Sequence, residues 1–246
     1  MSESAITESA NRQRYDQRAD LAAVLLDVGG VLLVPDPVRV GQITAAHGGT
    51  DDVAALIRAH FGAIAAADNG TVLEWATYDH ELLAGAGVPE DRITAAAEAV
   101  TAAYTAQNLW DFPLPGAAAG LARLADTGLR VGIVSNSDGT VEQTLRAAGI
   151  AQLGPGPGVQ VEVLLDSHTV GVAKPDPAIF AIALNQLGLP ASQALYVGDT
   201  RTFDVAGARA AGLHPVHLDP YADCPQPADH DHVTGVAELA DRLDRR

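Results

Sequence analysis

The stretch Leu21–Val34, LAAVLLDVGGVLLV, most constrains what this chain can fold into. An unbroken apolar run ends at one acid, Asp27, and two glycines separate it from a second apolar run. A short apolar run bounded by glycine is typical of a fully buried parallel strand. Asp27 would then stand at the carboxyl end of that strand, where ligands bind in open α/β sheets. A carboxylate buried there costs free energy unless it is paired or binds a metal, so the chain must supply its companions.

Strands and helices alternate over the second half of the chain, which predicts an α/β fold with a doubly wound parallel sheet. Helices closed by glycine are expected between the strands. The polar, Pro-rich segment 219–231 is expected to be a solvated loop, with His230 and His232 in solvent and Cys224 incidental. Apolar runs predict five strands, at residues 22–27, 129–134, 159–165, 194–198 and 213–217.

The segment between the first two predicted strands has a different composition. Alanine dominates from residue 38 to about residue 108, and helical periodicity replaces the strand pattern. Helices are expected at residues 38–47, 51–67, 72–84 and 90–107. The expected organisation is therefore an α/β core from residues 21–36 and 111–246, an inserted all-helical cap at 37–110, and a disordered leader at 1–20.

The charge balance excludes several kinds of partner. Lys and Arg number 15 and Asp and Glu number 31, so the formal net charge is −16. Such a chain repels nucleic-acid backbones and anionic membranes, and no apolar run approaches the length of a membrane span. One cysteine and a polar N-terminus without an apolar signal region predict a reducing, cytoplasmic location.

Polar side chains follow three further strands and would meet Asp27 at one edge of the sheet. Three close carboxylates cannot all stay ionised without a counter-charge, and Mg²⁺ prefers oxygen ligands of this kind together with substrate phosphate. A carboxylate can attack phosphorus, while an ammonium and a hydroxyl stabilise charge on the phosphate oxygens. This arrangement predicts phosphoryl transfer with Mg²⁺. The residues are Ser135 and Asn136 after the second strand, Lys174 after the third, and Asp199 and Asp204 after the fourth.

Four segments carry motifs in a characteristic order and spacing. They are Leu25–Leu32 with D-x-x-G, Ile133–Asn136 with a strand before Ser, Gly171–Phe180 around Lys-Pro, and Val197–Asp204 with Gly-Asp. With these motifs the chain resembles the haloacid dehalogenase-like hydrolase superfamily from about residue 21 onward. The helical segment between the first two motifs is similar to the α-helical cap of one subgroup. The resemblance implies a cleft between cap and sheet and a small phosphorylated substrate; a monomer or homodimer is expected.

The resemblance also implies a role for each residue. The implied reaction is a Mg²⁺-dependent, two-step hydrolysis of a phosphate monoester through phospho-Asp27. Catalysis would rest on Asp27, Ser135 and Lys174, and phosphate would be held by Ser135, Lys174 and the Asn136 amide. The metal residues would be Asp27, the Gly29 carbonyl and Asp199, with Asp204 orienting a ligated water or Lys174 from behind them.

One position departs from the pattern of the family. Most of its phosphatases carry a second Asp two places after the nucleophile, where it protonates the leaving group, and this chain has Gly29 there. Such acid–base assistance typically supplies about 10²–10⁴ in rate. Either the leaving group departs without a proton, or another group supplies one; Asp36, Asp138 and a residue of the cap are the candidates.

Two other functions stay open at this point. A 2-haloacid dehalogenase needs no acid because halide leaves unprotonated, but dehalogenases of the family usually have a bulky residue at this place and lack the Gly198-Asp199 metal motif. A non-catalytic phosphate-binding or regulatory protein is also compatible with Gly29. A response-regulator receiver is disfavoured by the helical insert and by the segment Lys174–Pro177.

Overall fold

A parallel β-sheet of six strands forms the centre of the structure, a computed structural model that describes residues 20–225 and 228–244. The strand order is β10-β9-β8-β1-β4-β7, and every pairing within this sheet is parallel. The predicted doubly wound α/β fold is confirmed, whereas the predicted leader, apart from Asp20, lies outside the described residues. The strands are β1 (Ala23–Leu26), β4 (Arg130–Ser135), β7 (Val163–Asp166), β8 (Ala194–Gly198), β9 (His214–Leu218) and β10 (Asp231–Val233).

The first strand of the chain, β1, lies in the middle of the sheet between β4 and β8. The chain runs outward from β1 through β4 to β7, then crosses to β8, β9 and β10 on the other side. All four residues of β1 are buried, as an apolar strand covered on both faces must be. The order reverses beside β1, so the carboxyl ends of β1 and β8 flank the position where open parallel sheets bind ligands.

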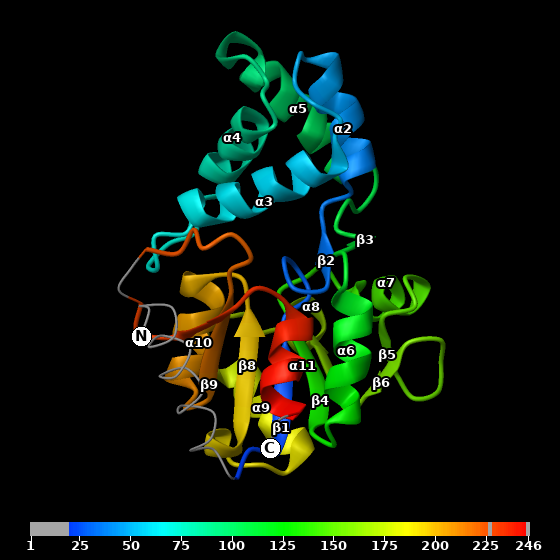
Figure 1. Cartoon of the computed structure of the whole chain (residues 1–246), viewed down its shortest axis with the longest axis vertical. Helices are drawn as coiled ribbons and strands as arrows, with labels where there is room; N and C mark the ends of the chain where they lie inside the picture. Colours follow the sequence, from blue (N-terminus) through cyan, green and yellow to red (C-terminus); the bar gives the residue numbers. More distant parts are fainter. Residues whose placement is uncertain (1–19, 226–227, 245–246) are drawn as a thin grey trace, which may run out of the picture.

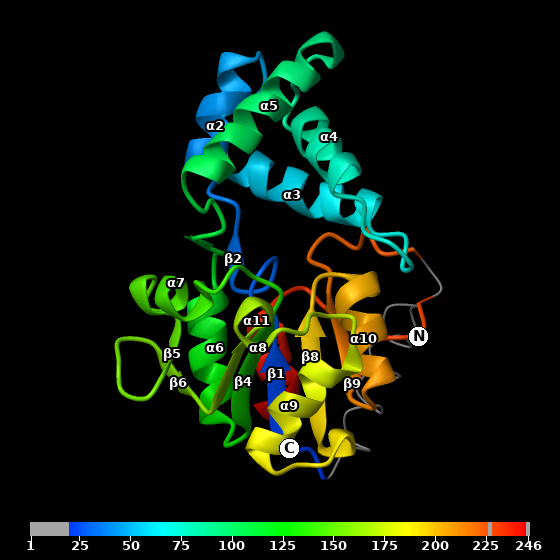
Figure 2. The same ribbon diagram turned by 180° about the vertical axis from the view of Figure 1, so that it is seen from behind.

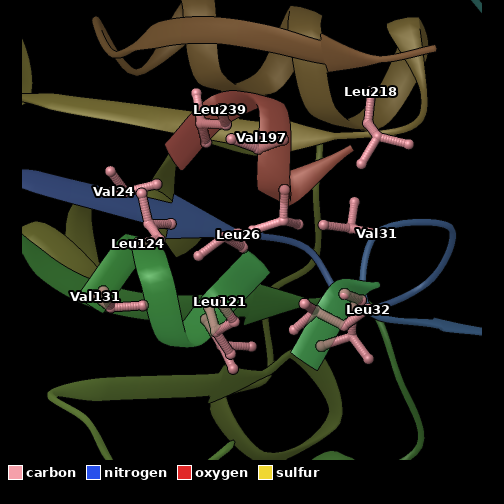
Figure 3. Packing of buried hydrophobic residues seen from close by; sticks show 14 of the residues in the cluster. Val24, Leu26, Val31, Leu32, Leu121, Leu124, Val131, Val197, Leu218 and Leu239 are labelled. Atoms are coloured by element: carbon pink, nitrogen blue, oxygen red, sulfur yellow. The ribbon is translucent and has the colours of Figure 1, made fainter. Parts of the chain in front are cut away.

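Helices cover both faces of the sheet (Figures 1 and 2). Successive residues of β1 point to opposite faces, so Val24 and Leu26 pack with Leu124 and Leu239 of the helices on one face (Figure 3). Leu25 points the other way and packs in a second cluster under the helices of the opposite face. The first face carries α6 (Ala117–Asp126) and α11 (Val236–Asp244), and the second carries α9 (Pro177–Leu187) and α10 (Ala206–Ala210).

Four helices form an insertion between β1 and β4, above the carboxyl edge of the sheet (Figure 1). We call them the helical insertion. Asp36 and Asp52 cap the first two helices through their side chains, as short acids at helix starts do. Buried apolar side chains give the insertion a core of its own, which includes Leu56, Ile64 and Leu82. Its helices are α2 (Pro37–Ala46), α3 (Val53–Ala67), α4 (Trp75–Gly85) and α5 (Glu90–Ala106).

Short elements complete the fold. The strands β2 and β3, which precede and follow the helical insertion in the chain, pair antiparallel with each other. The strands β5 and β6 form a separate parallel pair. A π-helical turn, η2, leads directly into α10. These elements are β2 (Leu33–Val34), β3 (Phe112–Pro113), α7 (Val141–Ala147), β5 (Ala151–Leu153), β6 (Val159–Val161), α8 (Ser167–Val170), η1 (Ala191–Gln193) and η2 (Arg201–Val205).

The structure corrects two details of the predicted element list. The single strand predicted at residues 159–165 is split at Glu162, because β6 pairs with β5 while β7 pairs with β4. The segment 219–231, predicted to be a loop, ends in a sixth strand, β10, which reaches Val233 and pairs with β9. Within the described ranges, no helix combines the length and the apolar character needed to cross a membrane.

Candidate active site

Asp27 directly follows β1 and lies at the carboxyl edge of the sheet with only 8% of its surface exposed. Its Oδ2 forms an ion pair with Lys174 Nζ at 2.8 Å. Its Oδ1 is buried and has no hydrogen-bond partner among the residues that the structure describes. Burial raises the pKa of Asp27 from 3.8 to about 6, although the charge of Lys174 opposes that rise.

The ammonium group of Lys174 is held by three acceptors. Besides Asp27, Nζ donates to Asp204 Oδ1 at 2.7 Å and to the Tyr196 hydroxyl oxygen at 2.8 Å. An ammonium has three protons, so each one has a partner. Burial lowers the pKa of Lys174, but Asp204 and Asp27 outweigh this and hold the pKa above its usual value. Lys174 is therefore a fixed cation in the site.

Asp204, in η2, has both carboxylate oxygens engaged. Oδ1 faces Lys174 and the Tyr196 hydroxyl, and Oδ2 accepts from the Thr200 backbone N–H at 2.9 Å and from Thr200 Oγ1 at 2.5 Å. Burial raises the pKa of Asp204, but Lys174 and Thr200 more than offset this, so the pKa lies below its usual value. These contacts fix Asp204 as an ionised anchor for Lys174 and for the start of η2.

Asp199 follows β8 and lies against the turn after β1. A Cβ placed on Gly30 would collide with the Asp199 carboxylate, and Gly30 itself has φ +64°. Glycine is needed here on both counts, because other L-residues resist this backbone conformation. Burial, together with the nearby charges of Asp204 and Asp27, raises the pKa of Asp199 well above its usual value. Among the residues that the structure describes, Asp199 has no ion-pair partner, although the charge of Lys174 partly opposes the rise of its pKa.

Ser135 and Asn136 lie at the end of β4 and line the same cavity as Asp27. The Asn136 side chain makes two hydrogen bonds to the backbone of Lys174. Its Oδ1 accepts from Lys174 N at 2.8 Å, and its Nδ2 donates to Lys174 O at 2.9 Å. The side-chain amide of Asn136 is thus committed to positioning Lys174. This leaves the backbone N–H of Asn136 as the amide that can meet a phosphate.

A cavity of about 340 Å³ opens over these groups. Its floor is the carboxyl edge of the sheet, where all the predicted residues except Asp204 contribute to the lining. Asp204 lies behind Lys174 and is 1% exposed. The helical insertion contributes apolar side chains to the opposite wall, namely Ile64, Leu73 and Trp75. The sheet side is polar and the insertion side is apolar.

Gly29 lies under an indole ring. A Cβ at this position would approach Cζ3 of Trp110 to 3.2 Å, so a longer side chain would require Trp110 to move. Asp36 does not line the cavity, since its carboxylate caps α2 and pairs with Arg39. Asp138 does line it, but hydrogen bonds led by the Thr140 hydroxyl lower its pKa, which favours the ionised form. Asp36 is therefore wrong as a proton donor to this cavity.

The structure adds residues that the sequence did not single out. Tyr196 receives a hydrogen bond from Lys174, and its hydroxyl lies 2.8 Å from the Val134 carbonyl. Thr200 holds Asp204, and Trp110 covers Gly29. A hydroxyl-bearing aromatic residue inside the otherwise apolar strand β8 was the one available signal, because a buried tyrosine needs a polar partner.

The charges of the cluster can be summed. Three carboxylates, Asp27, Asp199 and Asp204, lie with ligand atoms within 4.8 Å of one another. With Lys174 the formal sum is −3 + 1 = −2. A buried sum of −2 beside the unpartnered Asp27 Oδ1 fits one divalent, oxygen-preferring cation such as Mg²⁺.

Comparison with known proteins agrees with this geometry. The family model described as haloacid dehalogenase-like hydrolase matches residues 21–212. The haloacid dehalogenase-like hydrolase domain-containing protein 3 of Bos taurus is 30% identical over 147 residues, 57% of this chain and 55% of that protein. The phosphoglycolate phosphatase of Rhodospirillum rubrum is 38% identical over 114 residues, 46% of this chain and 44% of that protein. The chain thus spans about half the length of these curated relatives.

Solved structures share the whole architecture. A HAD phosphatase from Thermococcus onnurineus has a TM-score of 0.55 at 21% identity, covering 91% of this chain and 98% of its own. A 2-haloacid dehalogenase from Pseudomonas syringae pv. Tomato DC3000 has a TM-score of 0.53 at 22% identity, covering 92% and 99%. These two likenesses show the fold. Since the family model covers most of the chain and its motifs meet at one edge of the sheet, the protein belongs to the haloacid dehalogenase-like hydrolases.

Proposed function

We propose that this hydrolase removes phosphate from a small phosphate monoester, with Mg²⁺ at the carboxyl edge of β1 and Asp27 as the nucleophile. The observation that carries the proposal is the buried cluster with formal charge −2, in which Asp27 Oδ1 has no partner within the described part of the chain. The likeness to the phosphoglycolate phosphatase of Rhodospirillum rubrum supports a phosphorylated substrate.

Asp27 Oδ1, the Asp199 carboxylate and the Gly29 carbonyl would hold the ion. When bound, Mg²⁺ supplies positive charge that compensates both the carboxylates and the substrate phosphate. Asp204 acts behind these groups, because its oxygens are already taken by Lys174 and Thr200. This refines the predicted role of Asp204 to that of an anchor.

The reaction has two steps, formation of phospho-Asp27 and its hydrolysis. Asp27 attacks phosphorus, a new Asp–phosphate bond forms, and the ester oxygen leaves with the bonding electrons. Lys174, fixed by Asp204 and Tyr196, stabilises the negative charge on the phosphate oxygens, and Ser135 donates its hydroxyl proton to one of them. Water then attacks phosphorus, the bond between phosphorus and the Asp27 oxygen breaks, and the Asp27 carboxylate is restored. The two protons of the water leave with the inorganic phosphate.

The absence of an Asp at position 29 restricts the leaving group. Within the described residues, Asp138 is the one acid lining the cavity besides Asp27 and Asp199, and its pKa is lowered, chiefly by the Thr140 hydroxyl. It is therefore a poor proton donor near neutral pH. We infer that the preferred substrate has a leaving group stable as an anion, such as a phenol, rather than a simple alcohol.

The helical insertion selects the substrate in this proposal. Residues 37–110 act as a cap, on a core of residues 21–36 and 111–246, and closure of the cap excludes water. Its apolar wall of Ile64, Leu73 and Trp75 favours an apolar body next to the phosphate. A monomer or homodimer in the cytoplasm, without nucleic-acid or membrane partners, completes the proposal.

A second candidate is a 2-haloacid dehalogenase. The site favours it in one respect: the indole of Trp110 covers Gly29 and the insertion wall is apolar, so no acid stands there. A dehalogenase needs none, because halide leaves without a proton. The buried Asp199 beside Asp27 disfavours it, because without a metal its negative charge would repel the carboxylate of a 2-haloacid. A non-catalytic phosphate-binding protein is the third possibility.

A substrate panel tests these functions. The wild-type chain is assayed with Mg²⁺ on aryl and alkyl phosphates and on 2-haloacids, and Asp27→Asn serves as the control. We expect Mg²⁺-dependent release of phosphate, faster from aryl than from alkyl esters, and none from Asp27→Asn. Halide release without phosphate release would assign the dehalogenase function. Binding of phosphorylated ligands without turnover of either class would assign the non-catalytic one.

A further inference from the structure

A second cluster of metal-ligating side chains, made of residues other than the three carboxylates, lies in β9, in β10 and in the segment between them. It consists of His217 in β9, His232 in β10, and Cys224 and His230 from the segment that connects the two strands. One ligand atom from each residue lies within 4.8 Å of the others. His230 and His232 were expected in solvent, and that expectation is wrong for His230, whose side chain is only 5% exposed.

The three imidazole rings surround a common point. Their centroids are 5.3, 5.3 and 4.7 Å apart. His230 Nε2 lies 3.6 Å from Cys224 Sγ. A tetrahedral zinc ion with Zn–N near 2.05 Å and Zn–S near 2.3 Å separates nitrogen from sulfur by about 3.6 Å. Two nitrogen ligands would be about 3.3 Å apart, and since every pair of ligand atoms lies within 4.8 Å, no pair needs to close by more than about 1.5 Å.

Two ring nitrogens of the cluster lack partners. His217 Nδ1 and His232 Nε2 are buried and make no hydrogen bond to any described residue. His217 as a whole is 93% buried, being 7% exposed. A buried polar atom without a partner destabilises the fold, and a bound ion would remove that cost.

Hydrogen bonds on the outer side of two rings select the tautomer that binds metal. His217 Nε2 donates to the Asp199 carbonyl at 2.9 Å, which leaves the Nδ1 lone pair facing the cluster. His230 Nδ1 lies 3.0 Å from Asp229 Oδ1, to which it donates, and its Nε2 lone pair faces Cys224 Sγ. Metal-ligating histidines almost always have such an outer acceptor.

We propose that His217, Cys224, His230 and His232 bind one Zn²⁺ ion in a closed, four-coordinate structural site. Three imidazoles and one thiolate suit zinc, whereas Mg²⁺ prefers oxygen ligands. Closed sites of this composition stabilise a fold rather than activate water. The inference does not depend on the proposed phosphatase activity.

The position of the site gives the ion a structural task. Asp223, next to Cys224, pairs with Arg58 of α3 through two contacts at 2.7 and 2.8 Å. The ion would therefore fasten the segment that holds the helical insertion to the core. His217 also connects it to the backbone of Asp199.

Metal analysis of the purified chain, made without a polyhistidine tag and dialysed against excess Mg²⁺, tests the proposal. We expect about one zinc per wild-type chain, and less than about a tenth in Cys224→Ser and His232→Ala. His80→Gln is the matched control, since His80 lies exposed in the helical insertion, and it should keep its zinc. Zinc content that is equal in wild type and both cluster variants would overturn the proposal.

Wild-type protein gives a second readout that needs no variant. Chelator-treated chain is titrated with Co²⁺, and a tetrahedral cysteine-containing site gives strong visible bands and a near-ultraviolet sulfur-to-metal band. Re-addition of Zn²⁺ should remove these bands, raise the melting temperature and protect Cys224 from alkylation. A folded chain that binds neither metal and alkylates equally with and without zinc would contradict the site.

Discussion

The two walls of the cavity are held in place by different forces. On the sheet side, Lys174 is fixed by three acceptors, and each of its contacts is buried. On the insertion side, Ile64 and Leu73 are held by apolar packing, whereas Trp75 is 51% exposed and contacts the Tyr78 ring. Hydrogen bonds fix positions closely, whereas apolar packing accepts other residues of similar volume. The sheet side is thus suited to one chemistry, and the insertion side can change with the substrate.

Apolar and polar contacts join the two parts. Ile57 and Phe61 of α3 belong to the apolar cluster of the core, and Phe61 lies against the Tyr221 ring. Asp68, which ends α3, accepts hydrogen bonds from the backbone of Arg201 and from Thr202 at the start of η2. Arg58 pairs with Asp223 at the surface. The Asp68 contact reaches the helix that carries Asp204, so the insertion is connected directly to the anchor of Lys174.

The largest expected effect is the loss of Lys174. Lys174→Met leaves Asp27 and Asp204 facing each other without their cation, and breaking one side of a buried ion pair costs about 3–5 kcal/mol. Urea unfolding measures this cost. Arg58→Met is the matched change in the insertion, where an exposed pair contributes about 1 kcal/mol or less. Equal losses in the two variants would remove the distinction between the buried ion pairs of the site and the exposed ion pair of the insertion.

Asp68→Ala is expected to have the next largest effect. It removes the acceptor for the first N–H groups of η2, and loss of such a cap costs about 1–2 kcal/mol. The free energy of unfolding checks the cost, and hydrogen exchange of η2 amides checks its location. Asp52→Ala is the control, because Asp52 caps the start of α3, opposite to the end at Asp68, and should leave η2 exchange unchanged.

The two glycines after Asp27 should respond differently to alanine. Gly30→Ala places a Cβ on the Asp199 carboxylate at a positive φ, which alone costs about 1–2 kcal/mol and also displaces a proposed metal ligand. In Gly29→Ala the new Cβ contacts only the Trp110 ring, at 3.2 Å. Calorimetric Mg²⁺ affinity should fall strongly for Gly30→Ala and little for Gly29→Ala. The reverse order would contradict the position assigned to Asp199.

The smallest predicted effect is a pH dependence of stabilisation by Mg²⁺. Burial raises the pKa of Asp27 from 3.8 to about 6, so the proton it gains on acidification favours the folded, metal-free state. That contribution is present below about pH 4 and is lost as the pH rises through about 6. Saturating Mg²⁺ should therefore raise the melting temperature more at about pH 7.5 than at about pH 5. An equal rise at both pH values, or an unchanged rise in Asp199→Asn, would argue against binding at these carboxylates.

The sequence predicted the sheet edge well because its signals are local. Apolar runs placed the strands, and the polar residue after each run had to lie at the carboxyl edge. What the sequence missed depends on pairing in three dimensions. The side chain of Asn136 is taken by the Lys174 backbone 38 residues away, which no spacing rule reveals. The edge strand β10 is three residues long and pairs with β9 alone, so it carries no periodic pattern.

The most direct test of the central claim is detection of the covalent intermediate. The wild-type chain is mixed with Mg²⁺ and an aryl phosphate, quenched in acid within one turnover, and digested for mass spectrometry. The account predicts one phosphoryl group on the peptide carrying Asp27, which disappears on a chase without substrate and never forms in Asp27→Asn. Full turnover with an unmodified Asp27 peptide at every time point would contradict it.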